Sequence, residues 1–213
     1  YNPREIKNKI SSAKNEMMSI DSFAKVEFDH KVVEVYKEYQ QKLKNGNSVD
    51  FDDLLILPIK LFKNYPRVLE EYQDRYKYIL IDEYQDTNEA QYTFSKLLSA
   101  KYRNIFVVGD NDQAIYAFRG ANYKNILNFE KDYPEAKTIL LEENYRSTKT
   151  ILNAANSVIK NNHERKDKNL WSNNATGNKI KYKEVANEKE EASFVGTEIK
   201  RLLSEGINEE DIA

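Results

Sequence analysis

The chain has 213 residues, of which 40% are hydrophobic and 32% charged, which is typical of a folded globular protein and excludes a disordered one. It contains no cysteine and two histidines, which excludes disulfides, thiolate zinc sites and cysteine nucleophiles and disfavours a multi-histidine metal site. The net charge of -2 argues against a uniformly basic nucleic-acid binder but leaves room for a local basic patch. No apolar run approaches the roughly 18 residues of a membrane-spanning helix, so we expect no membrane partner.

Residues 1–48 have the spacing of helices. Ile6, Ile10 and Met17 mark one apolar face, and a longer periodic run follows Asp21. That run ends at Asn45-Gly46-Asn47, which has the chemistry of a turn. We therefore expect a helical region that ends at this turn.

Two more helices are expected before residue 76: Asp50 would cap a helix over Phe51–Phe62, and Pro66 would begin a short one. From Tyr76 onwards, short apolar runs alternate with helical segments, which predicts a parallel α/β sheet with buried strands. The expected strands are Tyr78–Ile81, Ile105–Val108, Thr138–Leu141 and, after a polar loop, Lys179–Val185. The expected helices cover 89–99, 123–131, a segment after Thr148 and a charged segment after Asn187.

Two adjacent carboxylates, Asp82 and Glu83, end the first expected strand. α/β proteins bind ligands at the carboxyl ends of their parallel strands. There an aspartate can hold Mg²⁺, and an adjacent glutamate can orient and deprotonate a water molecule that attacks a phosphate. The alternative is that both acids stand at a helix N-terminus and favour its dipole. The pattern alone leaves both interpretations open.

The segment after the second expected strand combines a turn, an amide and two aromatic residues with a cation. Gly109 permits a sharp turn, and Gln113 can hydrogen-bond to a phosphate or to water without adding charge. The alternative is an Asx-rich turn with structural hydrogen bonds. Tyr116, Phe118 and Arg119 suit stacking on single-stranded bases together with a phosphate contact, and core packing is the alternative.

Tyr145 and Arg146 follow the third expected strand. Arg146 is able to reach a developing phosphoryl charge, and Tyr145 offers a face to a purine. An ordinary salt bridge is the alternative for the arginine.

Basic residues outnumber acidic ones between residues 153 and 183. Such a stretch is either a solvated surface or a contact to a phosphate backbone. The basic residues are Lys160, Arg165, Lys166, Lys168, Lys179, Lys181 and Lys183, and the acidic ones are Glu164 and Asp167.

Three long segments contain most of these candidates, each at the end of an expected strand. They are Leu80–Asn88, Val108–Ala121 and Leu141–Thr148. In order and content they closely resemble the second, third and fourth motifs of the superfamily 1 DNA helicases of the UvrD/PcrA/Rep type. Asp50–Leu55 is similar to a further segment of that family, and Asn169–Trp171 extends the resemblance weakly.

The resemblance implies nucleotide-binding and catalytic roles for five positions. Asp82 would coordinate Mg²⁺, and Glu83 would be the general base for the water that attacks the γ-phosphate of ATP. Gln113 would sense that phosphate and couple it to the DNA groove. Tyr145 would stack near the adenine, and Arg146 would contact the γ-phosphate.

The resemblance also implies DNA contacts. Tyr116, Phe118 and Arg119 would contact single-stranded DNA, with Phe118 where relatives often carry tryptophan. Phe51 is a candidate for a base pocket. Trp171 is expected to be a packing residue.

The fold implied by the resemblance is part of a RecA-like P-loop NTPase domain with a parallel sheet. Residues 1–48 would be the remainder of a helical insert, 49–145 the second half of the first RecA-like motor domain, and 146–213 the beginning of a second. No glycine of the chain is followed by lysine, so the phosphate loop Gly-x-x-x-x-Gly-Lys-Ser/Thr is absent from this sequence. With no methionine at the start and an apolar run beginning at the end, we expect a chain cut at both ends.

By this interpretation the parent protein couples ATP hydrolysis, with Mg²⁺, to 3′ to 5′ translocation along single-stranded DNA. It would unwind duplexes at single/double-strand junctions in DNA repair or replication, in the bacterial cytosol or nucleoid. The piece alone would be inactive because it lacks the phosphate loop. The alternatives are a non-catalytic DNA-binding or interaction module and the motor part of a helicase-nuclease.

Overall fold

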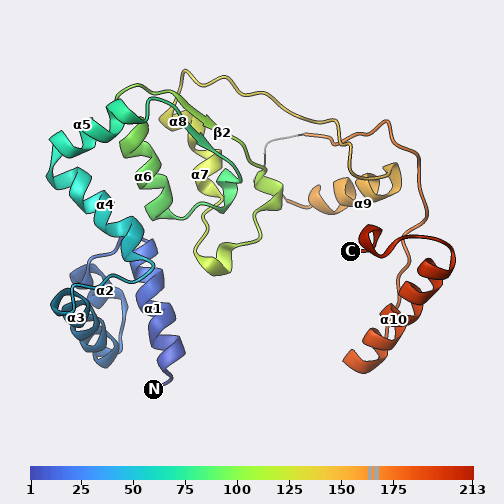
Figure 1. Cartoon of the computed structure of the whole chain (residues 1–213), viewed down its shortest axis with the longest axis horizontal. Coiled ribbons are helices and arrows are strands. Elements are labelled where there is room, and N and C mark those ends of the chain that lie inside the picture. The colour runs from blue at the N-terminus through green and yellow to red at the C-terminus, as the bar shows by residue number, and fades with distance from the viewer. Residues whose placement is uncertain (163–164, 166–167) are drawn as a thin grey trace. The chain divides into compact units, whose positions relative to one another are not determined.

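A computed structural model of the chain describes residues 1–162, 165 and 168–213 (Figure 1). The described residues divide into two compact units. The first unit comprises residues 1–141 and 159–168, and the second comprises 142–158 and 169–213. Among the described residues, no helix is both long enough and apolar enough to cross a bilayer.

The N-terminal part of the first unit is helical, as the sequence predicts, and consists of three helices. They are α1 (Pro3–Asn15), α2 (Ile20–Val26) and α3 (His30–Asn45). Each helix begins where a polar side chain accepts a hydrogen bond from a backbone amide of the first turn. These caps are Asn2, Ser19 and Asp29. The periodic run after Asp21 was expected to be continuous, but it is two helices, because Asp29 begins a new one.

Apolar side chains from all three helices form one core. Phe23 packs edge-on against Tyr36, with ring centroids 5.6 Å apart and an interplanar angle of 83°. Their neighbours in this core are Ile10, Ala13, Val32 and Val33. Burial of these side chains stabilises the helical region, and it leaves the C-terminal end of α1 beside α4 and α6 (Figure 1).

The next helices are α4 (Asp53–Asn64), α5 (Pro66–Arg75) and α6 (Glu89–Ser99). The expected start of α4 at Phe51 is wrong, because the helix begins at Asp53. The capping interaction expected of Asp50 is nevertheless present: its Oδ1 accepts a hydrogen bond from the Asp53 amide at 2.8 Å. Asp53 Oδ2 in turn accepts one from the Asp50 amide at 3.3 Å, so the two acids hold Phe51 and Asp52 in a turn.

The sheet of the first unit has two parallel strands, β1 (Ile79–Ile81) and β2 (Ile105–Val107). This confirms the predicted parallel pairing, with α6 as the crossover between them. Burial of both faces was expected and is wrong. Ile79 and Ile81 line a cleft with residues of α6. Leu80 is 72% exposed, because successive strand residues point to opposite faces and only one face is covered.

Other expected elements are interrupted or missing. The helix over 123–131 is two short ones, α7 (Lys124–Leu127) and α8 (Phe129–Asp132), separated at Asn128. The strands expected at Thr138–Leu141 and Lys179–Val185 are wrong, since neither segment forms a ladder with any described residue. An apolar run becomes a strand only when a neighbouring strand satisfies its backbone.

The second unit contains α9 (Lys149–Ile159) and α10 (Glu188–Ser204), both as expected. Asn187 caps α10 by accepting hydrogen bonds from the amides of Lys189 and Glu190. An isolated parallel bridge joins Glu143 to Trp171. Trp171 is 46% exposed, in keeping with a packing residue at the surface.

Candidate functional site

Asp82 and Glu83 lie directly beyond the C-terminal end of β1, and both are exposed. Asp82 Oδ1 accepts a hydrogen bond from the Glu83 amide at 2.9 Å. Glu83 adopts a left-handed backbone with φ of 49°, which is uncommon for a residue other than glycine. The chain turns here into the short 3-10 helix η1 (Tyr84–Asp86), and the fully buried Tyr84 anchors the turn by donating its amide to Val108 O at 2.9 Å.

A buried glutamine joins the ends of the two strands. Gln85 is 1% exposed; its Nε2 donates to Glu83 Oε2 at 2.8 Å, and its Oε1 accepts from the Asp110 amide at 2.9 Å. Sequence reasoning missed this residue, because nothing in the pattern distinguishes it from the polar residues around it. The only available signal is an amide side chain two residues after a strand-end glutamate.

Gly109 stands where the second strand-end loop approaches Gln85. A Cβ atom at this position would lie 2.6 Å from Gln85 Oε1 and 2.8 Å from Ile126 Cδ1. The glycine was expected to permit a sharp turn, but φ at Gly109 is not positive. Glycine fits here because a Cβ atom would displace the side chains of Gln85 and Ile126.

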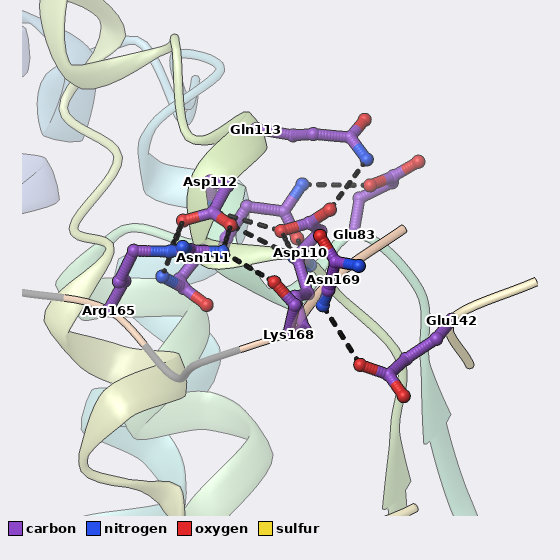
Figure 2. Close-up of polar contacts among 10 residues, drawn as sticks. Glu83, Asp110, Asn111, Asp112, Gln113, Glu142, Arg165, Lys168 and Asn169 are labelled. Carbon is purple, nitrogen blue, oxygen red and sulfur yellow. Dashed lines mark hydrogen bonds and ion pairs between the residues drawn. The ribbon is translucent and has the colours of Figure 1, made fainter. Parts of the chain in front are cut away.

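Gln113 ends the short 3-10 helix η2 (Asn111–Gln113) and is exposed. Its Nε2 donates to Asp110 Oδ2 at 2.9 Å, and Asp110 Oδ1 accepts from the Asp112 amide at 2.9 Å. The Asx turn that sequence reasoning left as an alternative is therefore present. The turn also places Gln113 in one hydrogen-bond chain with Glu83, through Asp110 and Gln85 (Figure 2).

The acids of this loop are paired with cations from residues 159–168. Arg165 makes two hydrogen bonds to the carboxylate of Asp112, at 3.2 and 2.9 Å, and Lys168 pairs with Asp110 (Figure 2). The side chains of Arg165 and Asp112 are 9% and 7% exposed. Burial raises the pKa of Asp110, but hydrogen bonds from Lys168, Gln113 and the Asp112 amide together hold it below its ordinary value.

The sequence left two interpretations for the basic stretch between residues 153 and 183, and these ion pairs exclude both for two of its residues. Arg165 and Lys168 are neither a solvated surface nor free to contact phosphates, because both are bound to carboxylates of their own chain. Lys181 is exposed and pairs with Glu198 at 2.6 Å. Three members of the stretch lie outside the described residues, namely Glu164, Lys166 and Asp167.

An aromatic pair with a cation follows η2. Tyr116 and Phe118 have ring centroids 6.0 Å apart, and the guanidinium carbon of Arg119 lies 4.9 Å and 5.3 Å from them. The alternative that these residues pack in the core is wrong for Phe118, which is 78% exposed. Tyr116 is half-buried. Phe51, before α4, is 87% exposed. Exposed rings beside a guanidinium group are suited to stacking on unpaired bases.

Tyr145 and Arg146 belong to the second unit, whereas the other candidates belong to the first. Both are exposed, and their turn is held by Asn144, whose Oδ1 accepts from the amides of Arg146 and Ser147 at 3.0 and 2.7 Å. The Tyr145 hydroxyl donates to Glu143 Oε2 at 2.8 Å, and this hydrogen bond raises its pKa. Arg146 makes no ion pair within the described part of the chain, so the salt-bridge alternative finds no support.

The acidic residues after β1 are suited to Mg²⁺ and not to a metal that needs three or more protein ligands. Among the described residues, no three histidine, cysteine or acidic side chains converge as a metal site. Mg²⁺ needs no such cage, because it commonly binds one or two carboxylates and completes its shell with water and phosphate oxygens. Asp82, exposed at the strand end, fits that donor set.

Together these features define a mixed helical and α/β protein with a small parallel sheet and polar loops at the strand ends. Residues 1–134 match the family model of the UvrD/REP helicase N-terminal domain, and residues 139–213 match that of the UvrD-like helicase C-terminal domain. The chain belongs to the UvrD/REP helicase family, which confirms the resemblance found in the motifs.

Several curated relatives are similar along nearly the whole chain. The ATP-dependent DNA helicase PcrA of Staphylococcus aureus (strain Mu50) is 52% identical over 216 residues, which cover 100% of this chain and 30% of the relative. The PcrA helicase of Bacillus subtilis (strain 168) is 54% identical over 209 residues, covering 97% of the chain and 28% of that protein. The chain thus spans about 30% of the length of the relatives it matches.

Proposed function

We propose that the chain is part of an ATP-dependent DNA helicase. The two family matches and the relatives named as DNA helicases support this, and so do the exposed acids beside a parallel strand. In the proposed architecture, residues 1–48 finish a helical insert and 49–145 form the second half of a RecA-like P-loop domain. Residues 146–213 begin a second such domain. The parallel β1–β2 pair with α6 as its crossover is consistent with that fold.

Glu83 is proposed to be the general base that activates water for attack on the γ-phosphate. Its carboxylate accepts a hydrogen bond from the buried Gln85, which fixes its direction while leaving the residue exposed to a substrate. Asp82 would hold Mg²⁺, which neutralises charge on the phosphate oxygens when it is bound. A sequence without the phosphate loop is expected to be inactive alone, because phosphoryl transfer depends on positioning of the phosphates.

Gln113 is proposed to couple the nucleotide to DNA. The observation that carries this proposal is the hydrogen-bond chain from Glu83 through Gln85 and Asp110 to Gln113. Tyr116 follows Gln113 within the same loop, so a shift of Gln113 toward a phosphate would be transmitted to the stacking residues. The substrate would be single-stranded DNA and its junctions with duplex, translocated 3′ to 5′ as the family resemblance implies.

The remaining candidates complete the two ligand sites. Phe118 and Arg119 would stack on and pair with the single strand, and Phe51 would line a base pocket. In the second unit, Tyr145 would stack near the adenine and Arg146 would contact the γ-phosphate. The absence of an intramolecular ion pair at Arg146 within the described residues favours this role.

The sharpest test is Glu83→Gln in the full-length protein that contains this chain. We expect ATP and DNA binding to persist while DNA-stimulated hydrolysis falls by roughly 10²-fold or more, since the amide cannot take a proton. Glu38→Gln, at an exposed position of α3, is the matched control and should hydrolyse ATP normally.

Unchanged turnover in Glu83→Gln would contradict the general-base assignment. A parent protein that binds DNA but hydrolyses no ATP would support the non-catalytic module instead. A DNA-cleaving activity in the same polypeptide would support a helicase-nuclease.

A further inference from the structure

The C-terminal end of α1 hydrogen-bonds to two segments that bear on the proposed DNA site and lies near a third. Lys14, whose side chain is 2% exposed, donates to Asp50 Oδ2 at 2.6 Å and to Asp53 Oδ1 at 2.8 Å. Tyr39 of α3 donates its hydroxyl to the same Asp50 oxygen at 2.9 Å. The turn that presents Phe51 is therefore fixed at both ends to the helical region, although Phe51 itself is 87% exposed.

Asn15, the last residue of α1, extends these contacts. Its Nδ2 donates to Asp52 Oδ1 at 3.0 Å, directly beside Phe51. Its Oδ1 accepts from Asn88 Nδ2 at 2.8 Å, and Asn88 caps α6 immediately after the segment that contains Glu83. The same Nδ2 also donates to Ser11 O at 2.9 Å, which fixes the orientation of the amide.

The turn that ends the aromatic segment lies near Asn15. Gly120 has a φ of 84° and directly follows η3 (Ala117–Arg119), in which Phe118 is exposed. A Cβ atom added at Gly120 would have Asn15 Cβ as its nearest neighbour, at 4.0 Å. The end of α1 is therefore close to the segments that carry Phe51 and Phe118, and its hydrogen bonds go to the Phe51 turn and to Asn88.

We infer that Asn15 is a positioning residue for nucleic-acid binding, because its side chain hydrogen-bonds the Phe51 turn to the segment after Glu83 and lies near the turn after Arg119. This rests on the proposed function, since it assigns DNA contacts to Phe51 and Phe118. In this arrangement Asn15 acts on DNA affinity through the position of Phe51 and does not itself contact the bases.

The charge environment explains why Asn15, rather than Lys14, is the residue to test. Removal of Lys14 would leave Asp50 and Asp53 buried without a cation, which destabilises a protein strongly whatever its function. Asn15 is neutral, and its replacement by alanine removes two intersegment hydrogen bonds without leaving a buried charge.

The experiment measures the affinity of the full-length protein for a fluorescent oligothymidylate by anisotropy. We expect Asn15→Ala to weaken binding about fivefold, the effect of one lost net hydrogen bond, with DNA-independent ATP hydrolysis unchanged. Asn8→Ala, an exposed asparagine of the same helix, is the matched control and should bind as the wild type does. In a Phe51→Ala background, Asn15→Ala should add little, because it acts through Phe51.

Exchange of the amide and the carboxylate between positions 15 and 52 tests whether Asn15 acts by positioning the Phe51 turn or only by stabilising the fold. Asn15→Asp alone sets two carboxylates against each other and should weaken DNA binding further than Asn15→Ala. Adding Asp52→Asn restores an amide-to-carboxylate hydrogen bond in the opposite direction and should recover part of the lost affinity, because a carboxylate at position 15 still cannot donate to Ser11 O. A residue needed only for stability would change the melting temperature without this recovery of affinity.

The possible failures are distinguishable. If Phe118→Ala and Phe51→Ala both bind DNA as tightly as the wild type, the proposed DNA contacts are overturned, and the inference with them. If Phe51→Ala weakens binding but Asn15→Ala does not, only the inference is overturned. It is also overturned if the effects of Asn15→Ala and Phe51→Ala are fully additive.

Discussion

Position 109 has no space for a side chain, because a Cβ atom there would lie 2.6 Å from Gln85 Oε1. We expect Gly109→Ala to lower the free energy of unfolding by about 1–3 kcal/mol, since Gln85 would have to move and lose hydrogen bonds. At Gly196 in α10, a Cβ atom would meet nothing within 4 Å. Gly196→Ala should therefore raise the free energy of unfolding by about 0.5–1 kcal/mol. Urea unfolding measures both, and effects of the same sign would contradict the packing argument.

Some residues of the candidate site could be predicted from the sequence, and others could not. Asp82 and Glu83 could be predicted, because two acids after an apolar run are visible in the sequence and the end of a parallel strand is a known location for ligands. Gln85 could not be predicted, because its importance lies in a contact with Asp110, which is 25 residues away along the chain. Such a contact depends on the register of the two strands.

At the scale of elements, η2 and residues 159–168 are joined by the Asp110–Lys168 and Asp112–Arg165 pairs. The folded protein holds the pKa of Asp110 below its ordinary value of 3.8. A depressed carboxyl pKa contributes stability above the unfolded pKa, and that contribution is lost as the pH falls through the folded pKa. The pairing therefore stabilises the protein at neutral pH and not in strong acid.

We expect Lys168→Met to lower the urea midpoint most near pH 7, because Asp110 then loses its cation. The difference from the wild type should begin to shrink near pH 3.8, where Asp110 of the unfolded chain takes up a proton, and disappear as the pH falls through the lower pKa of Asp110 in the folded protein. Lys160→Met, at an exposed position of the same segment, is the control and should show no such pH dependence. A constant difference at every pH would show that Lys168 acts by packing alone.

Elements whose stability is local were predicted well, and those that need partners were not. Helices α5, α6 and α10 lie where Pro66, the residues around Glu89 and Asn187 indicate, because caps and apolar spacing lie within each segment. Lys179–Val185 has the composition of a strand but forms no ladder with any described residue. Strand formation depends on a partner elsewhere in the chain, which composition cannot reveal.

At the scale of the whole molecule, the proposed ATP contacts come from both units. Asp82, Glu83 and Gln113 belong to the first unit, and Tyr145 and Arg146 belong to the second. The family could be recognised from the sequence because each motif is a contiguous run of residues.

We expect Arg146→Ala in the full-length protein to reduce ATP hydrolysis by roughly 10³-fold, the usual effect of losing an arginine that stabilises phosphoryl transfer. Affinity for single-stranded DNA without nucleotide should be unchanged, because the aromatic residues belong to the first unit. Arg4→Ala, at an exposed position of α1, is the control. Normal hydrolysis by Arg146→Ala would remove this residue from the nucleotide site.

The close approach of Gly109 to Gln85 has an evolutionary consequence. A larger residue at position 109 would displace the side chain of Gln85 and disturb the hydrogen bonds that link the two strand ends. The cost of a substitution at position 109 therefore depends on the residue at position 85. We expect a larger residue at position 109 to be tolerated more readily where position 85 carries a shorter side chain.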